Sequence, residues 1–148
     1  MTIRCEIVSQ DRKVFEGDVD IVVLPGADGE MGILPHHAPL LTTLKFGVIT
    51  VRSKNDEQNF TVAGGMAEVQ PQIVTVLADA AENVAEIDTA RAEAARQRAQ
   101  QALANLDKSG SDMDAYLDLE AALRRSNLRL DAAKRFRTAR RSPVASEE

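Results

Sequence analysis

The sequence predicts an α+β protein, with an N-terminal antiparallel β-sandwich or flattened barrel followed by a C-terminal antiparallel two-helix hairpin. Up to about Ala78, apolar residues recur at every second position, which is the period of strands. From Asp88 onward they recur every three to four positions, which is the period of helices. We therefore expect a β domain at residues 1–84, a helical hairpin at residues 85–141 and a frayed tail at residues 142–148.

Four segments carry the β signal, and turn-forming residues separate them. Residues 3–7 alternate strictly, and residues 48–52 and 59–63 do so less strictly, as in half-buried strands. Residues 73–77 form a continuous, mostly β-branched run, as expected for a strand buried on both faces. Many short strands with regular turns are typical of a sandwich or flattened barrel. The predicted turns are at residues 10–12, 25–29, 46–47, 54–57, 64–65 and 70–71.

Two helices are predicted, and together they form the hairpin. The first carries a stripe of small and apolar residues, namely Ala95, Ala99, Ala102, Leu103 and Leu106. Ser111-Asp112-Met113-Asp114 has the pattern of a capping box and opens the second helix. The apolar side of that helix is formed by Tyr116, Leu119, Leu123, Leu130 and Ala133. A hairpin rich in alanine buries little apolar area, so it must lean on the β domain, a partner or a ligand.

Composition excludes several functional classes. The chain has no Trp and five other aromatic residues, so we expect neither an aromatic-lined pocket nor a nucleic-acid partner. No nucleophile–base pair, metal-ligand cluster or glycine-rich phosphate loop indicates an enzyme. Cys5 alternates with polar neighbours and is expected to be a small buried strand residue. No window reaches the length of a membrane-spanning helix, so any membrane association would go through a partner.

The net charge of −5 is distributed unevenly along the chain. Residues 1–86 carry 13 acidic and 6 basic residues, whereas residues 87–148 carry 10 acidic and 12 basic residues. From Arg124 onward the second half is locally basic. This asymmetry suggests an acidic partner for that helix, and a solvated helix face is the alternative for any single arginine.

Residues 24–41 are the most informative segment. They hold three Gly and three Pro but keep Met31, Ile33 and Leu34 apolar, unlike an ordinary solvent-exposed loop. The pattern Gly-Glu-Met-Gly-Ile-Leu-Pro-x-His-x-Pro-Leu resembles the epsilon subunit of the bacterial-type rotary ATP synthase. Further motifs extend the resemblance over nearly the whole chain, at residues 62–71, 74–79 and 87–92.

The resemblance implies a non-catalytic central-stalk subunit of a proton-translocating ATP synthase, at the cytoplasmic face of the bacterial inner membrane. In that family the β domain docks on the gamma subunit and the c-ring as part of the rotor. The hairpin either folds down on the β domain or extends toward the alpha and beta subunits, which blocks hydrolysis. By position, Glu30, Met31 and His37 correspond to residues that meet rotor partners. Because His36 and His37 would point to opposite sides of an extended segment, we expect only His37 to touch a partner.

The resemblance also implies a candidate nucleotide site, because the compact hairpin of some family members binds ATP without hydrolysing it. No cofactor is required, and ATP would be a regulatory ligand. Asp88 begins the first helix, where it can cap the helix and orient Arg91. Arg125 and Arg129 leave one face of the second helix and can clamp a polyphosphate. The candidate residues are Glu82, Ile87, Asp88, Arg91, Ala92, Arg125 and Arg129.

Alternatives to this nucleotide site stay open. Asp88 can simply cap the helix, and the arginines can face water. In the extended state, arginines of the second helix can instead contact acidic residues of the beta subunit. The candidates for that inhibitory contact are Arg124, Arg125, Arg129 and Arg135. A function of a different class is a free-standing ATP-sensing module without a rotor role.

Overall fold

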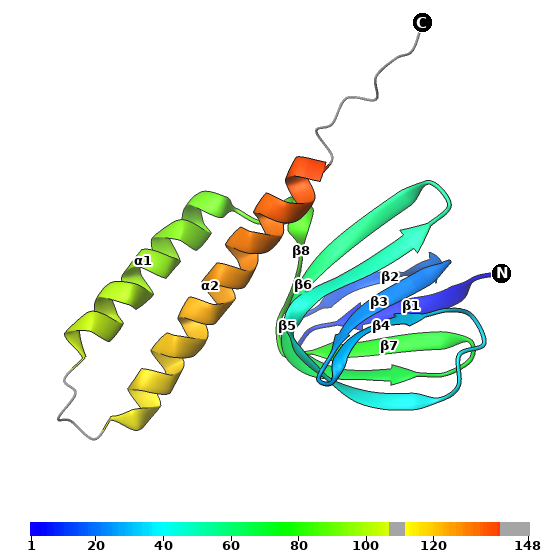
Figure 1. Cartoon of the computed structure of the whole chain (residues 1–148), viewed down its shortest axis with the longest axis horizontal. Helices are drawn as coiled ribbons and strands as arrows, with labels where there is room; N and C mark the ends of the chain where they lie inside the picture. The colour runs from blue at the N-terminus through cyan, green and yellow to red at the C-terminus, as the bar shows by residue number, and fades with distance from the viewer. Residues whose placement is uncertain (107–111, 140–148) are drawn as a thin grey trace, which may run out of the picture. The chain divides into compact units, whose positions relative to one another are not determined.

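The computed structural model describes residues 1–106 and 112–139 of the chain (Figure 1). The chain divides into two compact units, residues 1–86 and residues 87–148. The first is built of strands and the second of helices, so the predicted α+β fold class is confirmed. The predicted frayed tail at residues 142–148 lies outside the described residues.

Within the described residues the chain forms eight strands, a short 3-10 helix and two α-helices. In chain order the elements are β1 (Ile3–Val8), β2 (Lys13–Val19), β3 (Ile21–Gly26), β4 (Gly29–Ile33), β5 (Leu40–Ser53), β6 (Asp56–Val69), β7 (Ile73–Ala78), β8 (Ala81–Asn83), η1 (Val84–Glu86), α1 (Thr89–Asn105) and α2 (Met113–Ala139).

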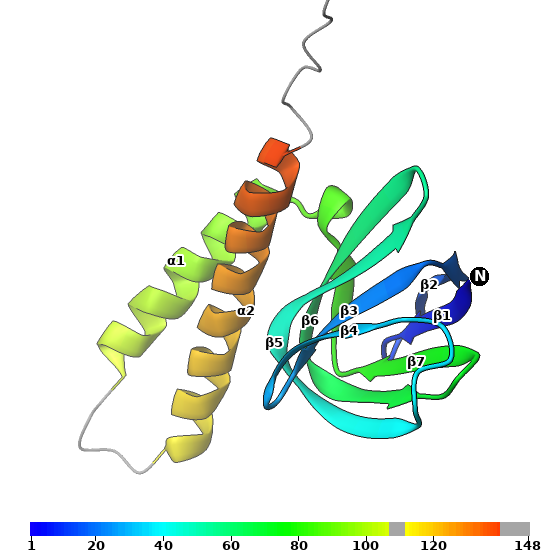
Figure 2. The same ribbon diagram turned by 45° about the vertical axis from the view of Figure 1, so that its right-hand side comes forward.

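The strands pair in the order β2-β1-β7-β6-β5-β3-β4, and β8 pairs with β6 (Figures 1 and 2). The two longest strands, β5 and β6, pair with each other along nearly their whole length and bend together. The second half of β6 continues the sheet through β7, whereas its first half pairs with β8. The sheet thereby folds over on itself as a sandwich. All pairs are antiparallel except β1 with β7, which is parallel.

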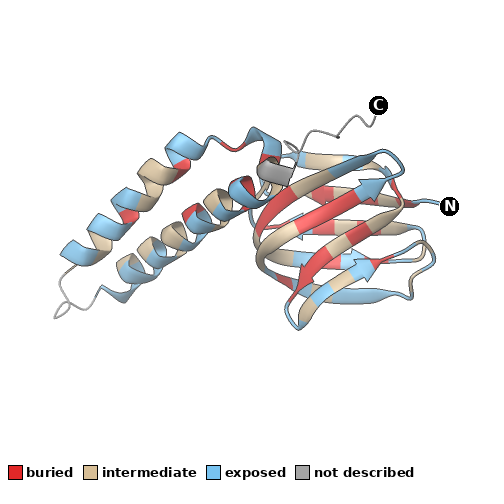
Figure 3. Cartoon of the chain, turned by 45° about the horizontal axis from the view of Figure 1, so that its top comes forward, coloured by how far each residue is buried: buried red, intermediate tan, exposed pale blue. Residues whose placement is uncertain are grey.

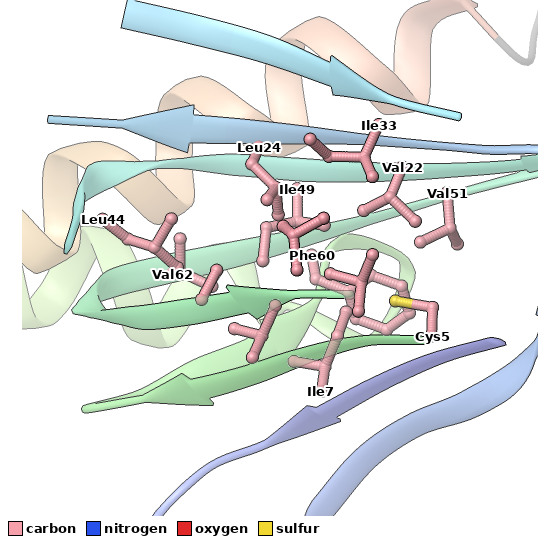
Figure 4. Packing of buried hydrophobic residues seen from close by; sticks show 14 of the residues in the cluster. Cys5, Ile7, Val22, Leu24, Ile33, Leu44, Ile49, Val51, Phe60 and Val62 are labelled. Atoms are coloured by element: carbon pink, nitrogen blue, oxygen red, sulfur yellow. The ribbon is translucent and has the colours of Figure 1, made fainter. Parts of the chain in front are cut away.

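The core of the β unit lies between the two halves of this bent sheet. Buried and less buried residues alternate along the strands, as expected when each strand turns one face inward (Figure 3). Figure 4 shows Leu24, Ile49 and Phe60 pointing into one interior, which Val, Ile and Leu dominate. The Phe60 ring lies 5.4 Å, centroid to centroid, from the ring of Phe15. Cys5 is fully buried in this core, which confirms the prediction for it.

The predicted turn at residues 46–47 is wrong, because these residues lie in the middle of β5. A Cβ atom built on Gly47 would lie 2.7 Å from the Cβ atom of Pro25 in β3. Glycine is therefore needed there because a neighbouring strand approaches closely, and not because the chain turns.

The predicted turn at residues 64–65 is also wrong, because both residues lie inside β6. Gly65 has φ +128°, and a Cβ atom on it would lie 2.8 Å from the Cα atom of Ala78 and collide with the Leu77 carbonyl. These are conditions that only glycine meets without strain. The glycine therefore lets β6 bend without ending.

The strand at residues 73–77 is not buried on both faces, contrary to the prediction. Val74 and Val76 point into the core, whereas Leu77 is 60% exposed. β7 has the core on one side only, so its residues alternate between inside and outside. The alternation is hidden in the sequence because two of the three outward residues, Ile73 and Leu77, are also apolar.

The first helix begins as the sequence predicts. The Asp88 side chain is the N-cap of α1, and its Oδ1 accepts a hydrogen bond from the Arg91 backbone N–H at 3.1 Å. Ala92 and Ala99 are the buried residues of α1, and Ala99 belongs to the predicted stripe. Small residues therefore mark the buried side of this helix, as Figure 3 shows for its red segments.

The second helix begins at Met113, one residue later than the predicted capping box implies. Asp112 acts as the cap, because its Oδ1 accepts a hydrogen bond from the Ala115 backbone N–H at 3.1 Å. Ser111 lies outside the described residues. Of the predicted apolar side, Ala133 is buried, but Tyr116 is exposed. The two helices lie side by side and run antiparallel, as predicted (Figures 1 and 2).

Candidate functional site

The β3–β4 hairpin holds two of the three residues predicted to meet rotor partners. Glu30 and Gly32 point outward from β4, and Met31 and Ile33 point inward. Met31 is half-buried and packs against the core, close to Gly26, where a Cβ atom would lie 2.6 Å from the Met31 methyl group. The Glu30 side chain is therefore exposed to a partner, whereas the Met31 side chain is only partly exposed.

The loop between β4 and β5 holds the third predicted residue, His37. The loop is a tight turn in which the His37 backbone N–H donates to the Leu34 carbonyl at 3.2 Å. His36 has φ +65°, and its backbone N–H donates to the Pro71 carbonyl at 2.9 Å. The premise that the two histidines lie on an extended segment is therefore wrong. The left-handed backbone of His36 itself sets their directions instead.

The side chain of His37 is held within this loop. It is half-buried, and its Nδ1 lies 2.7 Å from the Ala38 carbonyl oxygen, whereas His36 is exposed. An Nδ1–H donor to that carbonyl leaves Nε2 as the free ring nitrogen. A partner that contacts His37 would meet a ring whose orientation is already set.

An exposed apolar surface on the β unit was missed by the sequence analysis. Leu41, Met66 and Leu77 are 64%, 42% and 60% exposed, and they come from the adjacent strands β5, β6 and β7. Met66 lies directly opposite Leu77, and Leu41 is on the same outer face. We call Leu41, Met66 and Leu77 the outer apolar surface. In the sequence, this surface is indicated by an apolar residue at an outward-facing position of each of these three strands.

The candidate nucleotide residues divide between the two units. Glu82 lies in β8 of the β unit, opposite Thr61 of β6. The others lie in the helical unit, where Ile87 and Ala92 are buried and Arg91 is exposed. Packing accounts for Ile87 and Ala92, and capping accounts for the Asp88 carboxylate. The arginines are the side chains of this set that a ligand can reach most directly.

The end of α2 brings a further arginine to this region. Arg137 Nη2 donates to the carbonyl oxygen of Ile87, the residue that precedes the cap of α1. Sequence reasoning missed Arg137, because the partner of a residue across a hairpin depends on the length and path of the connection. The contact aligns the end of α2 with the beginning of α1.

The Arg137 contact indicates which of the two arginines proposed to clamp phosphate is nearer to this end of the hairpin. At about 1.5 Å of rise per residue, Arg129 lies about 12 Å and Arg125 about 18 Å along α2 from Arg137. Of the two, Arg129 thus lies nearer to the end of α2 that contacts the residue before α1.

The predicted inhibitory surface lies on the basic half of α2. Arg124, Arg125 and Arg135 are exposed, and Arg129 is half-buried. The Arg135 guanidinium carbon lies 5.1 Å from the centroid of the adjacent Phe136 ring. The first turns of α2 are instead acidic, with Asp112, Asp114, Asp118 and Glu120. This order of charge complements the helix dipole and leaves positive charge toward the C-terminal end.

Two further observations limit the chemistry of the described residues. Nowhere in residues 1–106 and 112–139 do three His, Cys, Asp or Glu side chains gather in a way that could hold a metal ion. None of the described helices combines the length and the apolar character needed to cross a membrane.

Two family profiles match the chain, one over the β unit and one over the helical unit. A family profile described as the beta-sandwich domain of the ATP synthase delta/epsilon chain matches residues 2–84. A second profile, described as the long alpha-helix domain of the same chain, matches residues 85–134. The chain belongs to the ATP synthase delta/epsilon family. Membership makes it a component of an ATP synthase, which confirms the resemblance seen in the sequence.

Relatives of the delta/epsilon family support this membership over most of the chain. The ATP synthase epsilon chain of Dehalococcoides mccartyi is 46% identical over 135 residues, which cover 91% of this chain and 94% of the relative. That of Stenotrophomonas maltophilia is 43% identical over 137 residues, which cover 92% of this chain and 95% of the relative. That of Pelotomaculum thermopropionicum is 52% identical over 103 residues, which cover 70% of this chain and 77% of the relative.

Chains in two solved ATP synthase structures share the fold. A chain in the Euglena gracilis mitochondrial ATP synthase, solved as OSCP/F1/c-ring, has a TM-score of 0.72 and 23% identity, and the match covers 90% of this chain and 81% of that one. A chain in the central stalk and c-ring of the Tetrahymena thermophila mitochondrial ATP synthase has a TM-score of 0.54 and 11% identity, with 90% and 97% covered. At these identities the likeness shows the fold alone.

Proposed function

We propose that the chain is a non-catalytic rotor subunit in the central stalk of a proton-translocating ATP synthase. In this proposal the β unit docks on the gamma subunit and the c-ring, and the hairpin regulates ATP hydrolysis. The subunit would then lie at the cytoplasmic face of the bacterial inner membrane, held there by the complex. The family membership and the two-unit organisation are the main support.

The outer apolar surface is the observation that carries the docking proposal. Three large apolar side chains on adjacent strands are unusual on the surface of a protein that works alone, and they typically mark an interface. A protein partner is expected to cover such an apolar sheet face. In this proposal that partner is gamma, on which the β domain docks in the epsilon family. Glu30 and His37 lie on the β4 strand and the following loop and would contact the polar loops of the c-ring.

The hairpin supports the regulatory half of the proposal. Its buried residues are mostly small, including Ala92, Ala99, Ala132 and Ala133, so separating the helices exposes little apolar area. From Arg124 onward, α2 carries the arginines proposed to contact acidic residues of the beta subunit. A weakly held helix with a basic half can therefore leave its partner helix and be stabilised elsewhere.

Exchange of apolar for acidic residues on the outer apolar surface tests the docking proposal. We expect Leu77→Asp and Met66→Asp to reduce co-purification of the subunit with gamma at least tenfold, since a charge would be buried in the interface. Leu117→Asp is the matched control, because Leu117 is a 52% exposed leucine of α2. If all three variants assemble like the parent chain while retaining its circular dichroism spectrum, this surface does not dock on gamma.

ATP binding by the hairpin is a second candidate function, favoured by the position of Arg129, which is nearer than Arg125 to the end of α2 that contacts the residue before α1. Titration calorimetry of the whole chain with ATP and Mg²⁺ measures it. We expect Arg91→Gln and Arg129→Gln each to weaken binding about tenfold, because each removes one charge-assisted contact with phosphate. Arg98→Gln, a charge-matched change at an exposed position of α1, should have no effect. Absence of heat at millimolar ATP would remove this candidate and leave the rotor proposal untouched.

A further inference from the structure

We propose that Arg137 is a latch that ties the end of α2 to the start of α1 and sets how readily the hairpin opens. The inference rests on the proposed function, in which the hairpin has a compact and an extended arrangement. It adds the residue that holds the compact arrangement closed. Arg137 would act as a positioning residue, since it orders the two helices without touching nucleotide or a partner subunit.

The partner of Arg137 is a carbonyl that the helix itself does not use. The backbone ladder of α1 begins when the Ala92 N–H donates to the carbonyl of Asp88 at 3.0 Å. The carbonyl of Ile87 lies one residue ahead of that ladder, and Ile87 is 3% exposed. A buried carbonyl outside secondary structure needs a donor from elsewhere in the fold. Arg137 Nη2 supplies this donor from a position 50 residues away in the chain.

The latch matters because the rest of the helix interface is weak. The buried residues of the two helices are small, namely Ala92, Ala99, Ser126, Ala132 and Ala133, and the leucines of the predicted apolar sides are at most half-buried. The Ser126 hydroxyl donates to the Ala122 carbonyl of its own helix at 3.0 Å, so it adds no bond between the helices. A charged donor on a buried carbonyl contributes more than a neutral hydrogen bond. One such contact therefore adds to the free energy that keeps the hairpin closed.

The position of the contact also suits a latch. Ile87 is the first residue of the helical unit, directly after the boundary at Glu86. Movement of the end of α2 away from the start of α1 breaks the Arg137 contact, and it frees the carbonyl beside the connection between the units. Opening at this end would then loosen the cap of α1 as well, which couples the last turn of α2 to the first turn of α1.

Hydrogen exchange of the whole chain tests the latch. We expect Arg137→Gln to raise the exchange rates of the amides in residues 126–137 and of Arg91 and Ala92 about tenfold, which is the effect of losing one charged hydrogen bond. Arg137→Lys keeps one donor and should restore most of the protection. Arg98→Gln removes the same charge from an exposed position of α1 and should leave the rates unchanged.

Two outcomes would overturn the latch. Equal exchange in Arg137→Gln and the parent chain would show that the contact does not hold the hairpin. Equal acceleration in Arg137→Gln, Arg137→Lys and Arg98→Gln would show that net charge, and not the contact with Ile87, is responsible. Amides of the β unit serve as the internal reference, since their protection reports whether each variant is folded.

Hydrolysis by the assembled complex separates failure of the latch from failure of the proposed function. If the hairpin inhibits when it opens, Arg137→Gln should lower hydrolysis several-fold and Arg137→Lys should not. If deleting the hairpin leaves hydrolysis unchanged, the regulatory proposal fails, whatever the exchange rates show. If deletion raises hydrolysis but Arg137→Gln alters neither exchange nor hydrolysis, only the latch fails.

Discussion

Gly47 in β5 lies directly against Pro25 in β3, so closely that a Cβ atom at position 47 would lie 2.7 Å from the Cβ atom of the proline. The proline ring is rigid and belongs to a paired strand, so it cannot move aside cheaply. This contact explains why a glycine lies in the middle of β5, which runs unbroken from Leu40 to Ser53.

Gly47→Ala should therefore destabilise the chain by about 1–3 kcal/mol, the range for overpacking a tight site. Urea unfolding followed by circular dichroism measures the change. Gly32→Ala is the matched control in the neighbouring hairpin, because its Cβ atom would make an ordinary 3.5 Å contact with Ile21. Equal unfolding midpoints for the two variants would contradict the assignment of Gly47 to a close approach between strands.

Burial raises the pKa of the Cys5 thiol from about 9 to about 12, with a smaller contribution from the charge of Glu6. At pH 8 the native chain should thus react with iodoacetamide about a thousandfold more slowly than the unfolded chain, because so little thiolate is present. Mass spectrometry of timed samples in buffer and in urea gives both rates. Comparable rates in the two solutions would show that Cys5 is not buried as described.

The direction of that shift also sets a pH dependence. The folded state favours the neutral thiol, so this contribution to stability is complete below about pH 9 and is lost as the pH rises toward about 12. Cys5→Ala should flatten this part of the stability curve.

Glu16 on β2 is held in its charged form by two basic neighbours. Hydrogen bonds from Lys13, at 2.7 Å, and from Arg4 lower the pKa of the Glu16 carboxyl. Because the folded pKa lies below the unfolded one, the contribution to stability is present above the usual glutamate pKa and is lost as the pH falls through the folded value. Removal of either base should bring the pKa back toward its usual range.

Carboxyl titration by NMR measures this effect directly. We expect the pKa of Glu16 to rise in Lys13→Gln and, to a smaller extent, in Arg4→Gln, following the order of the two hydrogen bonds. Lys54→Gln, in the turn between β5 and β6, is the charge-matched control and should not change it. An unchanged Glu16 titration in Lys13→Gln would mean that the ion pair does not persist in solution.

Asp88 caps α1 through its side chain, so Asp88→Ala should cost about 1 kcal/mol of helix stability. Asn caps as well as Asp, and Asp88→Asn should therefore retain most of that stability. Hydrogen exchange at Arg91 and Ala92, without nucleotide, compares the variants. If the asparagine variant is as damaging as the alanine variant, the negative charge of Asp88 has a role beyond capping.

The sequence predicted the features of this chain that depend on local pattern. The strand and helix periods, the cap at Asp88 and the burial of Cys5 each follow from neighbours a few residues apart. Gly47 and Gly65 were misread as turns, because their reason lies in Pro25 and in Leu77 of other strands. The sequence shows that a glycine is present, and only the fold shows what lies opposite it.

The candidate sites show the same division. The motif singled out Glu30 as a residue that meets a rotor partner, but the left-handed turn at His36 depends on the partner of its backbone N–H, Pro71. Arg137 escaped notice because its contact with Ile87 spans the whole hairpin. Long-range pairs of this kind depend on strand register and helix alignment, which period alone does not determine.

The central claim is that the β unit assembles the rotor while the hairpin restrains hydrolysis. The most direct measurement is ATP hydrolysis by purified complexes that contain either the full chain or a chain ending at Glu86, the boundary between the units. We expect the shortened chain still to co-purify with the stalk and to support proton-coupled synthesis, while hydrolysis rises several-fold. Hydrolysis that stays at the full-chain rate, with the shortened chain present in the complex, would contradict it.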